Sequence, residues 1–204
     1  MAVEFKAKES YKGTFQRFWR GEAKILPAGY KLLNTISNGV KLLRAVLVQI
    51  FPDDLTAAVV KYGTVITGGT TTKIRVSKEN YFEVGDFVQV IDGSVAKQIT
   101  AVDHSNAEYD VITVNAALTG VEAGNYLVES DNASGEGQTP SAKYTPNNVL
   151  GAEKTIDDKI DFPTLDVAYD AVVIKDVIPP VPAAWLTDTG LCLKENHSIK
   201  FIKQ

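Results

Sequence analysis

Hydrophobic and polar positions alternate in short runs over most of the chain, and a period of two residues predicts β-strands. Within residues 81–130, β-branched and aromatic runs lie at 87–91, 98–102, 109–115 and 126–128. Turn residues such as Asp92-Gly93 separate these runs. Strands and turns at this spacing are typical of a small antiparallel barrel or sandwich.

The sequence on both sides of this module also predicts strands. Asn38-Gly39 lies between two apolar runs, which predicts a hairpin. The run at 40–51 fits either a buried strand or a short helix, and the proline directly after it favours the strand. Residues 164–177 alternate up to a proline-rich stretch, and 198–203 form a closing strand. Neither flank is able to close a core alone, so we expect the two to form one outer domain.

Two stretches rich in glycine and small polar residues mark domain boundaries. One is Gly68-Gly69 with the threonines after it, and the other is 131–148, where Gly, Ser, Pro and Asn dominate. The predicted fold class is mainly β. The predicted organisation is a β-sandwich-like outer domain with an inserted antiparallel β-barrel module, divided as follows: 1–69, N-terminal half of the outer domain; 70–130, inserted module; 131–148, linker; 149–204, C-terminal half of the outer domain.

The net charge of −4 combines a basic start with an acidic remainder. Residues 1–50 hold nine Lys or Arg against three Glu, and the rest of the chain holds twelve basic against twenty-two acidic residues. Such an asymmetry suits either a docking surface for an acidic partner or an imbalance without consequence. The basic residues are spread through strand-like sequence rather than clustered, so we expect no nucleic-acid partner.

Aromatic residues alternate with basic ones near the N-terminus. Three interpretations fit this pattern: stacking on nucleobases, an arm that packs on a neighbouring subunit, or core residues of an N-terminal strand. The arm and the core strand are favoured. After residues 179–182, a tryptophan in Ala183-Ala184-Trp185-Leu186 is expected on a single helical turn, buried as a wedge. The candidate docking or oligomer contacts are Tyr11, Phe15, Arg17, Phe18, Trp19, Arg20 and Trp185.

The sequence predicts no catalytic, cofactor-binding or metal site. His104 and His197 stand far apart, and the acidic run 157–161 lacks the Gly and distal Glu of a calcium loop. Cys192 lies between two leucines, which predicts a small core residue. No Walker motif is present, and a hydrolase with a dispersed pair of carboxylates is the remaining enzyme alternative. We therefore expect a non-enzymatic protein.

No apolar stretch approaches the roughly 20 residues of a membrane helix, and the first residues lack the features of a signal peptide. We therefore expect synthesis in a cytoplasm and no membrane partner.

Three parts of the chain resemble a family of capsid-surface proteins of tailed phages, the head-fibre or head-decoration proteins of phages of gut Bacteroidales. They are the strand pair in 57–66 (AAVVKYGTVI), the whole inserted module 70–130 with its segments VGDFV (84–88) and YDVITV (109–114), and the ending 191–204 with its IKFI strand. Together they span roughly half of the chain. The resemblance implies a virion protein bound to the major capsid protein on the capsid exterior.

The resemblance also implies a symmetric homo-oligomer, a trimer or a dimer, and it carries no catalytic residues. The basic, aromatic N-terminal part would be the docking foot, and the inserted module would project from it. The alternative function is a carbohydrate-binding or adhesion module of a phage tail, baseplate or bacterial surface. In that case a host-surface glycan would stack on exposed tyrosines such as Tyr81, Tyr109 or Tyr126.

Overall fold

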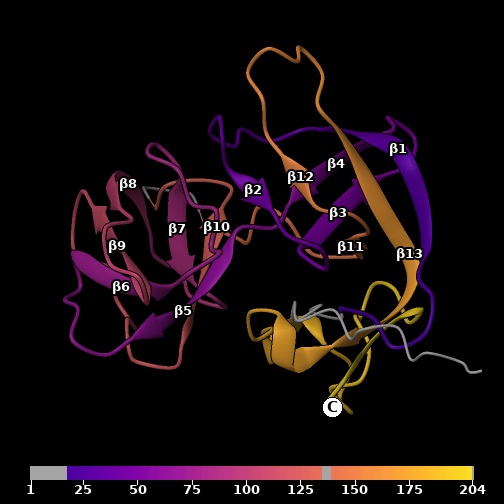
Figure 1. The fold of residues 1–204 in the computed structure, drawn as a ribbon. Coiled ribbons are helices and arrows are strands. Elements are labelled where there is room, and N and C mark those ends of the chain that lie inside the picture. The colour runs from indigo at the N-terminus through magenta and orange to yellow at the C-terminus, as the bar shows by residue number, and fades with distance from the viewer. Residues whose placement is uncertain (1–17, 135–138, 204) are drawn as a thin grey trace, which may run out of the picture.

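The protein is mainly β, as the sequence predicts. The structure, a computed structural model, describes residues 18–134 and 139–203. These residues form fourteen strands and two single-turn 3-10 helices. Figure 1 shows two bodies, a barrel and an outer domain, that lie next to each other.

The barrel consists of six strands whose antiparallel pairing closes on itself in the order β10-β5-β6-β9-β8-β7. Alternating positions point inward: along β9, Ile112 and Val114 are buried together with Asp110, while the residues between them are half-buried. Closure leaves none of the six strands with an open edge. The strands are β5 (Tyr62–Ile66), β6 (Lys73–Ser77), β7 (Phe87–Val90), β8 (Ala96–Asp103), β9 (Tyr109–Val114) and β10 (Tyr126–Ser130).

The barrel begins before residue 70, where the sequence analysis placed the boundary. Its first strand, β5, starts at Tyr62. Only two residues separate it from the end of β4 (Thr56–Val59) of the outer domain. Gly68-Gly69 instead lie in the turn between β5 and β6, within the barrel. Hairpin turns and linkers share glycine-rich composition, so composition alone does not separate them.

The outer domain is built from both ends of the chain. Its pairing order is β1-β4-β3-β11-β13-β14, and β13 also pairs back to β1, so five of these strands form a ring. A two-stranded ribbon of β2 (Lys41–Leu42) and β12 (Lys154–Thr155) extends it. The other strands are β1 (Lys24–Leu32), β3 (Leu47–Phe51), β11 (Asn148–Leu150), β13 (Thr164–Ile174) and β14 (Ile199–Ile202).

The far half of β13 carries the C-terminal part of the chain. It pairs in parallel with β14, while Trp19 bridges to Val173 and thereby adds the start of the described chain to the same strand. Two 3-10 turns follow β13: η1 (Lys175–Val177) and η2 (Ala183–Trp185). Trp185 is buried in the core cluster, and its ring meets that of Tyr62 edge-on at 5.3 Å and 82°. The first barrel strand therefore packs directly on the outer domain.

Replacing Trp185 by Ala should destabilise the protein by about 3–5 kcal/mol, because the substitution leaves a cavity between the two bodies. Leu191→Ala, at an exposed apolar position, is the control and should change the free energy of unfolding by less than about 0.5 kcal/mol. Denaturant unfolding followed by circular dichroism measures both. Equal losses in the two variants would contradict this packing role.

Candidate functional site at the junction of the two bodies

Polar and charged side chains gather where the barrel meets the outer domain. A cleft of about 340 Å³ opens on this junction. Its walls come from the loop before β2 on one side and from the barrel segments 78–83 and 104–110 on the other. The lining residues are Ser37, Val40, Lys41, Lys78, Glu79, Asn80, Tyr81, Phe82, Glu83, His104 and Asp110.

The segment after β6 reaches the cleft in an unusual backbone conformation. Glu79 and Tyr81 have φ angles of 63° and 61°, in the left-handed region that non-glycine residues seldom adopt. The buried Asn80 between them supports this shape, because its amide donates to the Ser77 carbonyl and its oxygen accepts from the Phe82 backbone N–H. Strained conformations of this kind persist only where the surroundings fix them.

Asp110 is the buried centre of a charged cluster in this cleft. One carboxylate oxygen lies 2.6 Å from Lys78 Nζ and 3.0 Å from His104 Nδ1, and the other accepts from Asn80 at 2.8 Å. Three donors thus compensate a carboxylate that sits in the inward-facing row of a barrel strand. The Nδ1 contact leaves Nε2 of the exposed His104 ring as the nitrogen that a second partner could reach.

His104 was predicted to stand alone, yet Asp110 lies only six positions later, across the turn between β8 and β9. A signal for this pair was present: an aspartate occupies an inward-facing position of an otherwise apolar alternating strand. The hydroxyl of Ser37 also lines the cleft, and it donates to Glu83 at 2.6 Å. The cluster therefore holds a histidine and a carboxylate, with Ser37 bound to a different acid.

Side chains of the barrel also bind the backbone of the outer domain. The Glu83 carboxylate accepts from both the backbone N–H and the hydroxyl of Ser37, at 2.7 and 2.6 Å. The Tyr81 hydroxyl accepts from the Leu43 backbone N–H at 3.3 Å, and burial raises the pKa of this phenol. These contacts fix one wall of the cleft to the other.

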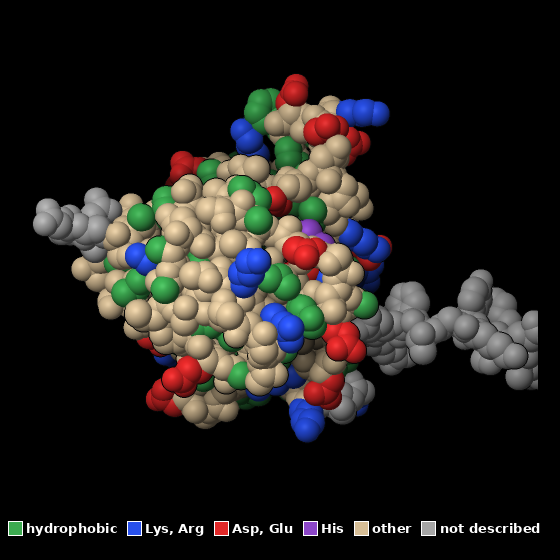
Figure 2. All heavy atoms as spheres, turned by 90° about the vertical axis from the view of Figure 1, so that its left-hand side faces the viewer, with side chains coloured by type: hydrophobic (Ala, Val, Ile, Leu, Met, Phe, Trp, Pro, Cys, Tyr) green, Lys and Arg blue, Asp and Glu red, His purple; other side chains and the backbone are tan. Residues whose placement is uncertain are grey.

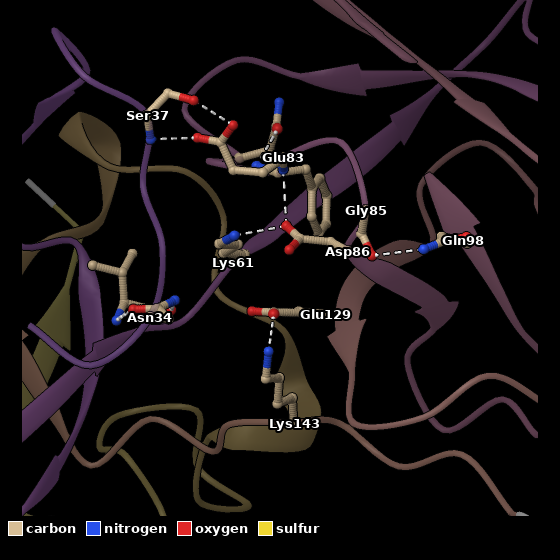
Figure 3. Close-up of polar contacts among 12 residues, drawn as sticks. Asn34, Ser37, Lys61, Glu83, Gly85, Asp86, Gln98, Glu129 and Lys143 are labelled. Atoms are coloured by element: carbon tan, nitrogen blue, oxygen red, sulfur yellow. Dashed lines mark hydrogen bonds and ion pairs between the residues drawn. The ribbon is translucent and has the colours of Figure 1, made fainter. Parts of the chain in front are cut away.

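Lys61 lies between the two bodies and is only 1% exposed. Its Nζ is 2.6 Å from Oδ2 of Asp86, and the same oxygen accepts from the Glu83 backbone N–H at 2.8 Å (Figure 3). Lys61 belongs to the short link between β4 and β5, so the crossing point of the chain is itself charged. A buried ammonium requires such a partner, because desolvation of an unpaired charge is costly.

A second ion pair, in which the glutamate is buried and the lysine is exposed, lies next to the first. Glu129 is on β10, and its backbone N–H donates to the Lys61 carbonyl. Its carboxylate is 2.6 Å from Lys143 Nζ, as Figure 3 also shows. Burial raises the pKa of Glu129, while Lys143 and Lys61 oppose that rise. Oε2 of Glu129 has no hydrogen-bond partner within the part of the chain that the structure describes.

The predicted docking residues differ in where they lie and in how far they are buried. Tyr11, Phe15 and Arg17 lie outside the described residues. Arg20 is exposed. Phe18 and Trp19 are half-buried against the same core cluster that contains Trp185. These three aromatic side chains therefore pack on one core cluster within a single copy of the chain. Trp185 is buried there, as the sequence suggested, and is not on a free surface.

The tyrosines named for glycan stacking are half-buried. Arg75 lies over the ring of Tyr109, with its Cζ 4.8 Å from the ring centroid. The Tyr81 hydroxyl is engaged at the junction. Arg75 therefore occupies one of the two ring faces of Tyr109 on which a sugar could stack.

Within residues 18–134 and 139–203, no group of three or more His, Cys, Asp or Glu side chains is placed to hold a metal ion. No helix in the same residues has the length and apolar character to cross a membrane.

Cys192 is a free thiol and is half-buried, where a core position was expected. It lies beside the C-terminal strand, bridging to Lys200.

Substituting Lys61 by Met should destabilise the protein by about 3–5 kcal/mol, since the change leaves Asp86 as an uncompensated, largely buried carboxylate. Lys24→Met is the matched control: Lys24 pairs with Asp170 at 2.7 Å, but both side chains are exposed to solvent, so the loss of stability should be far smaller than for Lys61→Met. Urea unfolding of the two variants gives the comparison. A similar loss for both would show that burial of the Lys61 pair has no special weight.

The raised pKa of Glu129 predicts a pH dependence of stability. A carboxyl whose pKa is higher in the folded state than its ordinary value of 4.5 contributes stability below that value, and this contribution is lost as the pH rises through the folded-state pKa. The free energy of unfolding of the native chain, relative to that of Glu129→Gln, should therefore fall from pH 4.5 toward neutral pH. Parallel unfolding curves of the two proteins across this range would contradict the assignment.

No protein-family model matches the chain, and neither a curated protein nor a solved structure matches it.

Proposed function

We propose that the chain is a non-enzymatic structural protein of a tailed-phage virion, bound to the capsid exterior as a head-fibre or decoration protein. The observation that supports this most is the junction of the barrel with the outer domain. There the charged side chains form ion pairs with one another: Lys61 with Asp86, Lys143 with Glu129, and Lys78 with Asp110. Such an arrangement suits a rigid connection between two modules.

The two-body construction fits a protein that docks with one part and presents another. The outer domain, built from both chain ends, would act as the base on the major capsid protein, and the closed barrel would project. Closure suits an exposed module, because an open sheet edge invites pairing with other chains. The half-buried state of the three tyrosines favours this function over the glycan-binding alternative.

Mixing the purified full chain with capsids of the encoding phage that lack this protein tests the proposal. The chain should sediment with the capsids in a saturable amount that follows the symmetry of the lattice, and capsids already carrying the protein should bind far less. A chain that stays in the supernatant with both kinds of capsid would refute the proposal.

A further inference from the structure

The segment between β12 and β13, residues 156–163, projects from the outer domain. It is the orange loop at the top of Figure 1, and Figure 2 shows the same projection bearing acidic, basic and hydrophobic side chains. Two large apolar side chains of this loop are exposed, Ile160 to 44% and Phe162 to 62%. Exposed apolar groups on a projection are a feature of contact surfaces.

Hydrogen bonds and burial hold the loop in one shape. The Ile160 backbone N–H donates to the Asp157 carbonyl at 3.1 Å, and that of Asp158 donates to Asn38 Oδ1 at 3.4 Å. Ile156, at the start of the loop, is buried in the core of the outer domain. A surface ordered before binding loses less conformational entropy when a partner arrives.

Two exposed leucines lie directly beyond the ends of neighbouring strands, Leu33 after β1 and Leu55 before β4. Lys31 Nζ lies 4.0 Å from the centroid of the Phe162 ring and covers one of its faces. Leu55 is adjacent, because its carbonyl accepts from the Lys31 backbone N–H, and Leu33 follows two residues after Lys31. Both leucines are exposed. We call residues 156–163 with Leu33 and Leu55 the knob.

The loop of the knob carries more acidic than basic side chains, and this charge indicates what kind of partner fits it. The loop carries Asp157, Asp158 and Asp161 against Lys159 alone. A complementary partner therefore combines positive charge with aromatic or aliphatic groups. Residues 1–17 of this chain have that composition: four basic side chains against two acidic ones, together with two phenylalanines and a tyrosine.

The positions of the two elements favour a second copy as the source of the segment. The Ile174 N–H donates to the Phe18 carbonyl at one end of β13, whereas the knob adjoins Thr164 at the other end. An eleven-residue strand spans about 33–37 Å, and seventeen extended residues span at most about 60 Å. More than half of the segment would be used merely to return to its own knob, while a neighbouring copy can bring its knob close to Phe18.

We propose that the knob binds the N-terminal segment of a second copy of this chain, so that arms are exchanged between subunits. This contact goes beyond capsid binding and does not depend on it. Reciprocal exchange of identical segments is a direct route to a closed symmetric oligomer.

Sedimentation velocity of the full chain over a range of concentrations tests the exchange. The native chain should associate. In the double variant Ile160→Ser/Phe162→Ser the dissociation constant of the oligomer should rise about tenfold or more. The control is Val84→Ser, at a barrel position that is 64% exposed, and it should leave association unchanged. A native chain that is monomeric throughout, or an oligomer that the knob variant does not weaken, would overturn the proposal.

Charge reversal tests the exchange between copies directly. One variant carries Glu in place of Lys6, Lys8 and Lys12, and a second carries Lys in place of Asp158 and Asp161. Each alone should fail to associate, because arm and knob then have the same sign, but an equimolar mixture should form mixed oligomers. Far-UV circular dichroism checks that both variants are folded, and folded variants that remain monomeric when mixed would contradict the exchange.

Discussion

The buried ammonium of Lys61 is the constraint on which the arrangement of the two bodies depends. It lies where the chain passes from the outer domain into the barrel, and among the described residues its ion-pair partner is Asp86 of the barrel. A lysine this deeply buried is tolerable only if its partner stays in place. The pair with Asp86 therefore fixes the crossing point of the chain against the barrel. The contacts of Glu83 with Ser37 and of Tyr81 with Leu43 then hold the outer domain in place beside it.

This junction accounts for the proposed role better than the cleft beside it does. A projecting module is useful on a virion if its direction relative to the base is fixed, and buried ion pairs with correct geometry impose direction as well as contact. The His104–Asp110 pair contributes to the same wall, since Asp110 also binds Lys78 and Asn80 of the strained segment after β6. The cluster supports the shape of the junction whether or not a ligand enters the cleft.

The alternating pattern was sufficient to predict the mainly β fold, because a period of two residues reports directly on burial of one face. The junction was not predictable in the same way. Lys61 stands in an apolar run that predicts only a strand, and its partner lies 25 positions later in the chain. Phe18 and Trp19 show the same limit: aromatic side chains among basic ones fit a docking arm and a core strand equally, and only the bridge to Val173 distinguishes them.

If the Lys61 pair couples the two bodies, the barrel and the outer domain unfold as one unit. Both tryptophans, Trp19 and Trp185, lie in the outer domain, so their fluorescence reports on that body, while hydrogen exchange of β6 and β9 amides reports on the barrel. Across a denaturant series the two probes should change at the same midpoint in the native chain and separate in Lys61→Met. Separate midpoints in the native chain, or coincident ones in the variant, would contradict the claim that the buried Lys61 pair couples the two bodies.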